Sequence, residues 1–170
     1  MQQIAEFFKV SYKEFETAWK KIYPNTPDQT IKNIYEKIKL PIRATKGSAG
    51  YDFFSPTDFN LETNKTITLP TGIRVKIEEG WFLGMFPKSG LGFKYRLQLD
   101  NTVGIIDSDY YYSDNEGHIF IKLTNDAKSP KLIEIKQGSS ICQGIFIPYG
   151  ITYNDNADGI RNGGFGSTSK

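Results

Sequence analysis

The spacing of hydrophobic positions along the chain changes near residue 40. Before that point, apolar side chains recur on one face of a helix in two runs, Phe15, Trp19 and Ile22 followed by Ile31, Ile34, Tyr35 and Ile38. After it, apolar and polar residues alternate with a period of two, as in residues 73–78 and 119–123. The pattern predicts two short helices followed by an antiparallel all-β domain.

The ends of the two predicted helices have recognisable signals. Ser11 and Glu14 have the spacing of a capping box, and Thr26 can cap a second helix that has Pro27 at its first position. Pro41 ends this second helix. We therefore expect an N-terminal α-hairpin extension over residues 1–40 that packs its aromatic faces on the main domain, the alternative being a surface for a protein partner.

The predicted β domain spans residues 41–153. Residues 141–149 are apolar at nearly every position, which predicts burial on both faces of the strand, in a sandwich or at a subunit interface. Residues 154–170 are rich in Asn, Asp, Gly and Ser and have no apolar period, so we expect a C-terminal arm that is mobile without ligand.

Composition excludes several classes of function. The 21 basic and 19 acidic residues give a net charge of +2 and are dispersed, which argues against nucleic acid as a partner. The single cysteine, Cys142, cannot form an intrachain disulfide, and with the single histidine, His118, it cannot form a Cys/His zinc site. No apolar run approaches the roughly 20 residues of a membrane span and no signal peptide is visible, so we expect no membrane contact and a cytoplasmic location.

Five short glycine-rich segments follow one another in a fixed order. They are residues 47–52, 87–91, 101–110, 137–143 and 161–168. Any one of them alone is a weak signal, because a glycine cluster is more often a turn than a site. The third is the most informative, because Asp107 follows two apolar residues and should be held at the end of a buried strand. An ionised carboxylate there can accept a proton from water, although an aspartate that caps a turn is the alternative.

The second segment joins Lys88, Ser89 and Gly90, which provide a cation, a hydroxyl and a close backbone approach for an anion. The alternative is a β-turn with an exposed lysine. The last segment differs from a nucleotide P-loop because the required lysine and following helix are missing.

The five segments together resemble the motifs of the homotrimeric deoxyuridine triphosphatase (dUTPase) family, from about Pro41 to Thr168. The resemblance implies a distorted jelly roll of the β-clip type, a homotrimer whose sites combine motifs from three subunits, and Mg²⁺-dependent conversion of dUTP to dUMP and pyrophosphate. Asp107 would activate the attacking water, Tyr110 would lie against the deoxyribose, and Asn101 would read uracil.

The same resemblance implies a wider substrate site. Its expected substrate-binding residues are Lys88, Ser89, Gly90, Asn101, Gly104, Ile106, Tyr110, Gln143, Arg161, Phe165, Gly166, Ser167 and Thr168, with Asp52 in a supporting polar network. Phe165 would stack on uracil when the arm closes, and Arg161 would bind the outer phosphates. The metal would be held mainly through the triphosphate.

The chain departs from the family pattern around the third and fifth segments, among other places. Tyr112 stands where a glycine is usual, so the hairpin is extended to Gly117 and His118 is expected on the surface. Arg161 lies four residues before Phe165, where many members have five. Two alternatives stay open. One is a related dCTP deaminase, although Lys122 occupies the position of the glutamate that a deaminase needs. The other is a nucleotide-binding regulatory protein on the same trimeric scaffold.

Overall fold

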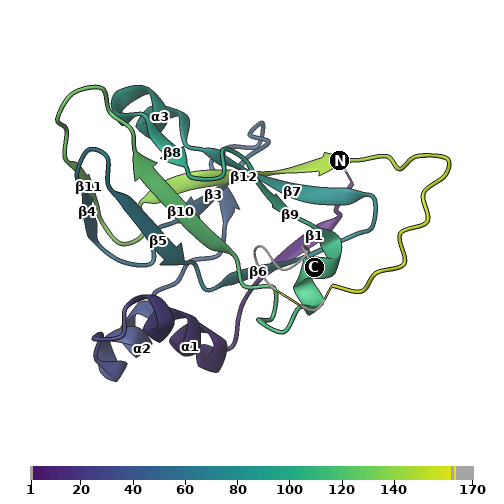
Figure 1. Cartoon of the computed structure of the whole chain (residues 1–170), viewed down its shortest axis with the longest axis horizontal. Helices are drawn as coiled ribbons and strands as arrows, with labels where there is room; N and C mark the ends of the chain where they lie inside the picture. Colours follow the sequence, from purple (N-terminus) through teal and green to yellow (C-terminus); the bar gives the residue numbers. More distant parts are fainter. Residues whose placement is uncertain (1, 162, 164–170) are drawn as a thin grey trace.

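A computed structural model of the chain describes residues 2–161 and 163 (Figure 1). The elements in chain order are β1 (Ala5–Lys9), α1 (Tyr12–Ile22), α2 (Asp28–Glu36), β2 (Ile42–Arg43), β3 (Tyr51–Phe54), β4 (Phe59–Leu61), β5 (Thr66–Pro70), β6 (Ile73–Ile77), β7 (Trp81–Pro87), α3 (Ser89–Tyr95), β8 (Leu97–Leu99), β9 (Gly104–Ile106), the 3₁₀-helix η1 (Ser108–Tyr112), β10 (Phe120–Asn125), β11 (Ile133–Ile135) and β12 (Ser140–Pro148). Every strand pair among the described residues is antiparallel, which confirms the predicted all-β class.

Two sheets enclose the core. One has the strand order β2-β3-β12-β7-β9 and the other β5-β10-β8, and two-stranded ribbons, β1-β6 and β4-β11, complete the domain. In β10, Ile121 and Leu123 are buried while Lys122 between them faces out, as the period of two predicted. These side chains share one hydrophobic cluster with Phe53 of β3 and Leu83 of β7, so the two sheets pack together over a common core.

Strand β12 fulfils only part of the prediction of burial on both faces. Ile141 and Cys142 are fully buried, but residues 145–147 are half-buried. The reason is the extent of pairing: β3 covers β12 only as far as Gly144, and beyond it β12 pairs with β7 alone.

Strand β1 corrects the expectation that the first 40 residues form a helical extension. It pairs with β6 from Ala5 opposite Ile77 to Lys9 opposite Ile73, so the chain enters the β domain first. The α-hairpin is therefore an insertion between β1 and β2. Residues 5–9 show no clean alternation of buried and exposed positions, which is why periodicity did not reveal the strand.

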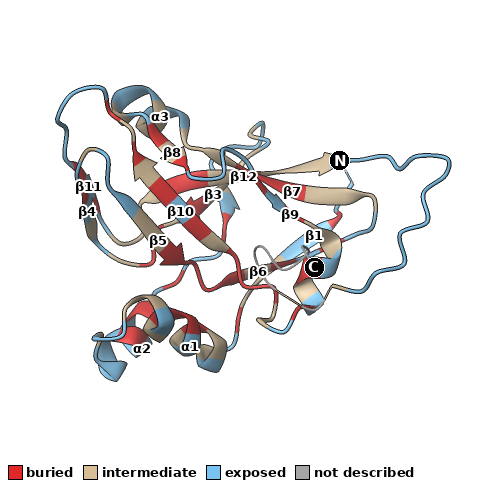
Figure 2. Ribbon diagram, viewed as in Figure 1, coloured by how far each residue is buried: buried red, intermediate tan, exposed pale blue. Residues whose placement is uncertain are grey.

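The inserted hairpin packs against the β domain, as predicted. Figure 2 shows buried residues of α1 and α2 on the side that faces the sheets. Phe15 of α1 and Ile31 of α2 are fully buried, and the Tyr23 hydroxyl donates to the Thr68 carbonyl at 2.6 Å. The aromatic face of the insertion is thus already covered by its own chain.

Tertiary contacts override part of the predicted capping. The Ser11 hydroxyl accepts the Glu14 N–H at 3.2 Å, which is half of a capping box. The returning bond is absent because the Ser11 N–H instead donates to Glu116 at 2.8 Å. Thr26 does not cap α2, since its hydroxyl accepts the Trp19 indole N–H at 3.1 Å and Pro27 occupies the N-cap.

Candidate active site

The candidate site residues are distributed along the pair of strands β7 and β9. The register places Leu83 opposite Ile106 and Met85 opposite Gly104, so Asp107 emerges beside Phe82. Lys88 lies six residues beyond Phe82, just past the other end of β7. At about 3.3 Å per residue, the backbones of Asp107 and Lys88 are separated by roughly 20 Å within one chain.

The first cluster lies at the Lys88 end and joins three of the predicted residues. Asp52 on β3 is opposite Gln143 on β12, and the Lys88 ammonium forms an ion pair with the Asp52 carboxylate. The Gln143 amide donates to the Pro87 carbonyl at 3.2 Å. Gly50 lies close to this side chain, because a Cβ at that position would lie 2.5 Å from Oε1 of Gln143 and the Gln143 amide would have to shift to admit it.

The segment after Lys88 begins a helix rather than forming a β-turn. α3 starts at Ser89, with Lys88 in extended conformation at the N-cap and no side-chain capping bond. The backbone N–H groups of Ser89 and Gly90 therefore belong to the first turn of a helix, where orphan donors suit a phosphate oxygen. The alternative of a turn with an exposed lysine is wrong, because Lys88 is paired and half-buried.

The second cluster lies at the Asp107 end. Arg161 donates from Nη2 to Oδ2 of Asp107 at 2.5 Å and from Nε to Oδ1 of Asp109 at 2.9 Å. The chain after β12 loops away from the domain and returns to η1, which brings Arg161 to this place (Figure 1). Asp107 occupies the N-cap of η1 but makes no side-chain capping bond, so the turn-capping alternative is wrong. Its side chain remains 43% exposed and accessible to water.

Tyr110 is held in one orientation beneath this cluster. Its side chain is buried, its hydroxyl donates to the His118 carbonyl at 2.7 Å, and the Asn115 amide donates to that hydroxyl at 2.8 Å. Burial raises the pKa of Tyr110, so the phenol stays neutral at physiological pH. The Arg161 guanidinium lies 5.9 Å from the centre of its ring.

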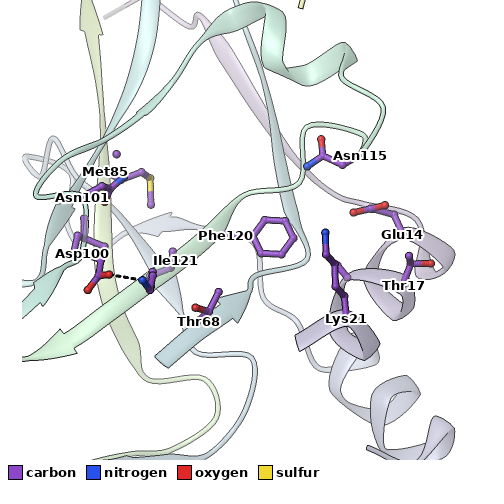
Figure 3. A pocket seen from close by; sticks show the side chains of 14 residues that line it. Glu14, Thr17, Lys21, Thr68, Met85, Asp100, Asn101, Asn115, Phe120 and Ile121 are labelled. Atoms are coloured by element: carbon purple, nitrogen blue, oxygen red, sulfur yellow. Dashed lines mark ion pairs between the residues drawn. The ribbon is translucent and has the colours of Figure 1, made fainter. Parts of the chain in front are cut away.

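A cavity of about 800 Å³ opens beside the hairpin that carries Asn101 and Gly104 (Figure 3). Phe120 of β10 lies between Asn101 and α1 in this view, and Lys122 pairs with Asp100 at 2.6 Å. Hydrogen bonds from Lys122 and Thr124 hold the pKa of Asp100 below its ordinary value. Ile106 is buried behind the hairpin rather than in the cavity.

Helix α1 supplies the far wall of this cavity, which the sequence analysis missed. Glu14, Thr17 and Lys21 line it together with Ala18. The spacing i, i+3, i+4 and i+7 places these four residues on one face of the helix. A signal was present, because three of the four are polar and lie on a face distinct from the one that carries Phe15 and Trp19.

His118 is buried, which overturns its predicted place on the surface. It has no exposed area, its Nε2 accepts the Gly72 N–H at 2.8 Å, and its Nδ1 lies 3.1 Å from Oε1 of Glu14. The longer loop after Tyr112 causes this, because it turns back over η1 and delivers His118 beneath α1.

Four predicted residues, Phe165, Gly166, Ser167 and Thr168, lie outside the described part of the chain. Within residues 2–161 and 163, no group of three or more His, Cys, Asp or Glu side chains has the arrangement of a metal site. No helix in the same part of the chain is long and apolar enough to cross a bilayer.

Antiparallel sheets over one core, with two separated polar clusters and a cavity at a β-hairpin, define an all-β class of protein with a cavity large enough for a small-molecule ligand. Within that class the comparison with known sequences is specific: the sequence model of dUTPase matches residues 36–169. The chain belongs to the dUTPase family, which confirms the resemblance, and its fold is the distorted jelly roll expected from it.

Individual relatives agree with this assignment. The chain is 37% identical over 134 residues to the deoxyuridine 5'-triphosphate nucleotidohydrolase of Lactococcus lactis, with 77% of this chain and 88% of the relative covered. It is 37% identical to that of Dictyoglomus turgidum, covering 70% and 79% of the two chains. The crystal structure of dUTPase from Streptococcus mutans matches with a TM-score of 0.62 at 28% identity, over 86% of this chain and 97% of that one. The dUTPase from phage phi11 of S. aureus shares the fold at 19% identity, with a TM-score of 0.63 and coverage of 93% and 98%.

Proposed function

We propose that this protein hydrolyses dUTP to dUMP and pyrophosphate, which limits uracil incorporation into DNA and supplies dUMP for thymidylate synthesis. The observation that carries the proposal is the placement of Asp107. It stands at the end of the hairpin strand whose neighbours Asn101 and Gly104 line the cavity, and its carboxylate is accessible to water. Asp107 does not itself line the cavity but follows Gly104 by three residues, and a water-accessible carboxylate fixed at the end of that strand is suited to act as a general base.

In the proposed reaction, Asp107 accepts a proton from water while the water oxygen forms a bond to the α-phosphorus. The bond from that phosphorus to the bridging oxygen breaks, and pyrophosphate leaves with the electron pair. Without substrate, the Arg161 guanidinium forms ion pairs with Asp107 and Asp109. An incoming triphosphate would attract the guanidinium to its own oxygens and leave the Asp107 carboxylate available as the base.

The hairpin that carries Asn101 and Gly104, together with Tyr110, would select the nucleoside. Asn101 would exchange hydrogen bonds with the polar edge of uracil, and the backbone at Gly104, which lines the same cavity and has no side chain, would approach the base and exclude a methyl group there. Such a site would reject thymine nucleotides by a steric clash with the methyl group. The loss of one favourable contact alone would discriminate between the two bases only about 10- to 200-fold. Tyr110, fixed through its hydroxyl, would leave no space for a 2′-hydroxyl.

The phosphate-binding residues Lys88, Ser89, Gly90 and Gln143 would come from a second copy of the chain. The separation of roughly 20 Å between Lys88 and Asp107 along β7 exceeds the reach of a lysine side chain. The edge strand β9 also leaves Ile105 half exposed and α3 leaves Phe93 94% exposed, as expected of surfaces that meet in an oligomer. We propose the homotrimer of the family, with the C-terminal arm closing over the site through Arg161, Phe165, Gly166, Ser167 and Thr168.

Mg²⁺ would neutralise and fix the triphosphate when bound. Mg²⁺ commonly uses one or two carboxylates, several waters and substrate phosphates, so a site without a three-residue cluster fits it. Asp107 and Asp109, which Arg161 brings together in the second cluster, would contact the hydration shell of the ion. A variant of the phage phi11 dUTPase has been described with a structural Mg(II) ion.

The other hypotheses receive no support from the described residues. Lys122, at the position where a deaminase needs a glutamate, is paired with Asp100 and offers no carboxylate. The inserted hairpin covers its aromatic face with its own β domain, so we do not propose a protein partner there. One fully buried free thiol, Cys142, agrees with a reducing cytoplasm, where we place the protein.

The decisive experiment measures pyrophosphate release from dUTP, UTP, dTTP and dCTP at equal concentrations with Mg²⁺. We expect turnover of dUTP only, and its loss when the ion is chelated. Ammonia released from dCTP would identify a deaminase, and nucleotide binding without any turnover would identify the regulatory alternative.

A further inference from the structure

The inserted α-hairpin is fastened to the loop that follows Tyr110. At the start of α1, the Ser11 N–H and hydroxyl both donate to the Glu116 carboxylate, at 2.8 and 2.6 Å. Burial opposes ionisation of this carboxylate, but the two bonds from Ser11 outweigh it and lower the pKa of Glu116. A segment inserted 100 residues earlier in the chain thus holds the extended loop in place.

A second contact lies one turn further along α1. His118 Nε2 accepts the Gly72 N–H, so that nitrogen carries no proton and Nδ1 carries it. The Nδ1–H therefore donates to Oε1 of Glu14, whose side chain is only 17% exposed. Since His118 is fully buried, this hydrogen bond fixes the imidazole between α1 and the start of β6.

His118 in turn is joined to Tyr110. The Tyr110 hydroxyl donates to the His118 carbonyl at 2.7 Å, and Asn115 donates to the same hydroxyl at 2.8 Å. The backbone at Gly117 approaches so closely that a Cβ there would lie 2.7 Å from the Tyr110 carbonyl oxygen. The position of the tyrosine ring is therefore set by the loop, and the loop is set by α1.

Helix α1 also faces the nucleoside cavity directly. Glu14 lines the same cavity as Asn101 and Gly104. In Figure 3 it lies across the cavity from Asn101, with Asn115 close to it. One helix thus bounds the cavity and fastens the loop after Tyr110, which also contributes Asn115 to the cavity lining. Tyr110 itself does not line the cavity within one chain, and its place against the sugar belongs to the proposed function.

We infer that Glu14 and His118 are positioning residues that hold Tyr110 for the rejection of ribonucleotides. The inference rests on the proposed function, in which the Tyr110 ring excludes a 2′-hydroxyl. The Tyr110 ring can exclude a 2′-hydroxyl by steric contact only if the ring is held in place. A small outward shift of the ring would make room for the one extra oxygen atom of a ribonucleotide. In this chain the insertion provides that rigidity where the usual short hairpin, with its glycine, is replaced by the longer loop from Tyr112 to Gly117.

The test compares kcat/KM for dUTP and UTP in full-length variants. Glu14→Ala removes the acceptor of the His118 bond, and we expect the dUTP/UTP ratio of kcat/KM to fall by about 2- to 10-fold, the worth of one hydrogen bond. Glu14→Gln retains an amide oxygen that can accept the Nδ1–H and should keep the wild-type ratio. Glu16→Ala is the matched control, because Glu16 lies on the same helix and pairs with Lys20, away from His118.

Two further measurements separate positioning from stability. First, the melting temperature of each variant is recorded. Second, Glu14→Asp keeps the charge but shortens the side chain by one methylene, and it replaces Glu14→Ala in the test if the alanine variant does not fold. A lower dUTP/UTP ratio in the alanine or aspartate variant, with Glu16→Ala unchanged, supports the inference. A lower melting temperature with an unchanged ratio would overturn it and leave dUTP hydrolysis standing, whereas a wild-type protein that fails to hydrolyse dUTP would overturn the proposed function itself.

Discussion

The two ends of the β7–β9 pair hold their charged groups by different means. At one end, Asp52, Lys88 and Gln143 come from adjacent strands or their ends, so sheet register alone brings them together. At the other end, Asp107 meets Arg161 of the returning tail, 54 positions further along the sequence. The first arrangement is built into the sheet, and the second depends on segments that can move apart.

The ion pairs at the two ends affect how a triphosphate would bind. In both clusters a cation already has an acidic partner, so a triphosphate must compete with Asp52 for Lys88 and with Asp107 for Arg161. We expect Arg161 to leave with the tail, since no strand pairing holds it, whereas Lys88 directly follows β7 and pairs with Asp52 of β3. We expect the tail end to change most when substrate binds, and the sheet end to change least.

The largest expected effect is on the carboxylate itself. Asp107→Asn preserves the shape of the side chain but removes the base, so turnover of dUTP should fall by about 10²- to 10⁴-fold with the fold intact. Pyrophosphate release and circular dichroism check the two parts of this prediction. Near-normal release would refute the role of Asp107 as the base.

Removal of the tail tests the mobile end without touching the sheet. Truncation after Tyr153 deletes Arg161 and the predicted arm, and we expect turnover to fall by about 10²-fold because the phosphates lose their orientation. The oligomeric mass, measured by light scattering, should equal that of the full chain. Unchanged kinetics would show that Arg161 and the arm take no part.

Mixing two inactive variants tests whether the two ends serve one site across copies. Lys88→Ala and Asp107→Asn chains, unfolded together and refolded at equal amounts, should regain about a quarter of the wild-type activity if each site takes its lysine and its aspartate from different subunits of a symmetric trimer. Each variant refolded alone is the control. No recovery in verified mixed trimers would mean that both residues act within one chain, against the roughly 20 Å that separates them on β7.

The sequence predicted the sheet end well and the loop end poorly, for a physical reason. Alternating hydrophobic positions identify strands such as β6 and β10, and the five glycine-rich segments mark where site residues are predicted. Strand pairing then brings Asp52 and Gln143 together with little further information. Hydrophobic periodicity does not predict contacts between irregular segments that are distant in the sequence.

His118 and strand β1 show this limit most clearly. A lone histidine after a polar loop indicates a surface residue, but here the imidazole is enclosed by α1 and β6 through bonds to Glu14 and Gly72. Strand β1 has no alternating pattern, and its pairing with β6 is visible only in three dimensions. The role of Arg161 as a partner of Asp107 was equally hidden, since nothing local links residues 54 positions apart.

A smaller effect is expected from the backbone of the Tyr110 loop. Gly117 has a φ of 70°, and an added Cβ would meet backbone atoms of Tyr110 and Tyr111 at 2.7 and 2.8 Å. Gly117→Ala should lower the free energy of unfolding by about 2–4 kcal/mol, from the strained conformation together with the clash. Gly80→Ala is the matched control: its φ is 82° but its Cβ would meet nothing within 4 Å, so a loss of about 1 kcal/mol is expected. Denaturant unfolding measures both, and equal losses would show that the loop yields to the added methyl group.

The smallest effect concerns Cys142, which reports on the rigid end. Its thiol is fully buried on β12 beside Gln143, and burial, with a contribution from Asp52, raises its pKa far above the ordinary value. Because the thiolate is disfavoured, we expect no reaction with iodoacetamide in the folded protein and no acceleration between pH 7 and pH 9. Tyr112→Cys places a thiol at a site that is 72% exposed on the loop, and this thiol should react at the rate of a free thiol and faster as pH rises. Mass spectrometry distinguishes the two cysteines. Rapid labelling of Cys142 would mean that the β3–β12–β7 region opens readily, and the contrast between a rigid sheet end and a mobile loop end would then be wrong.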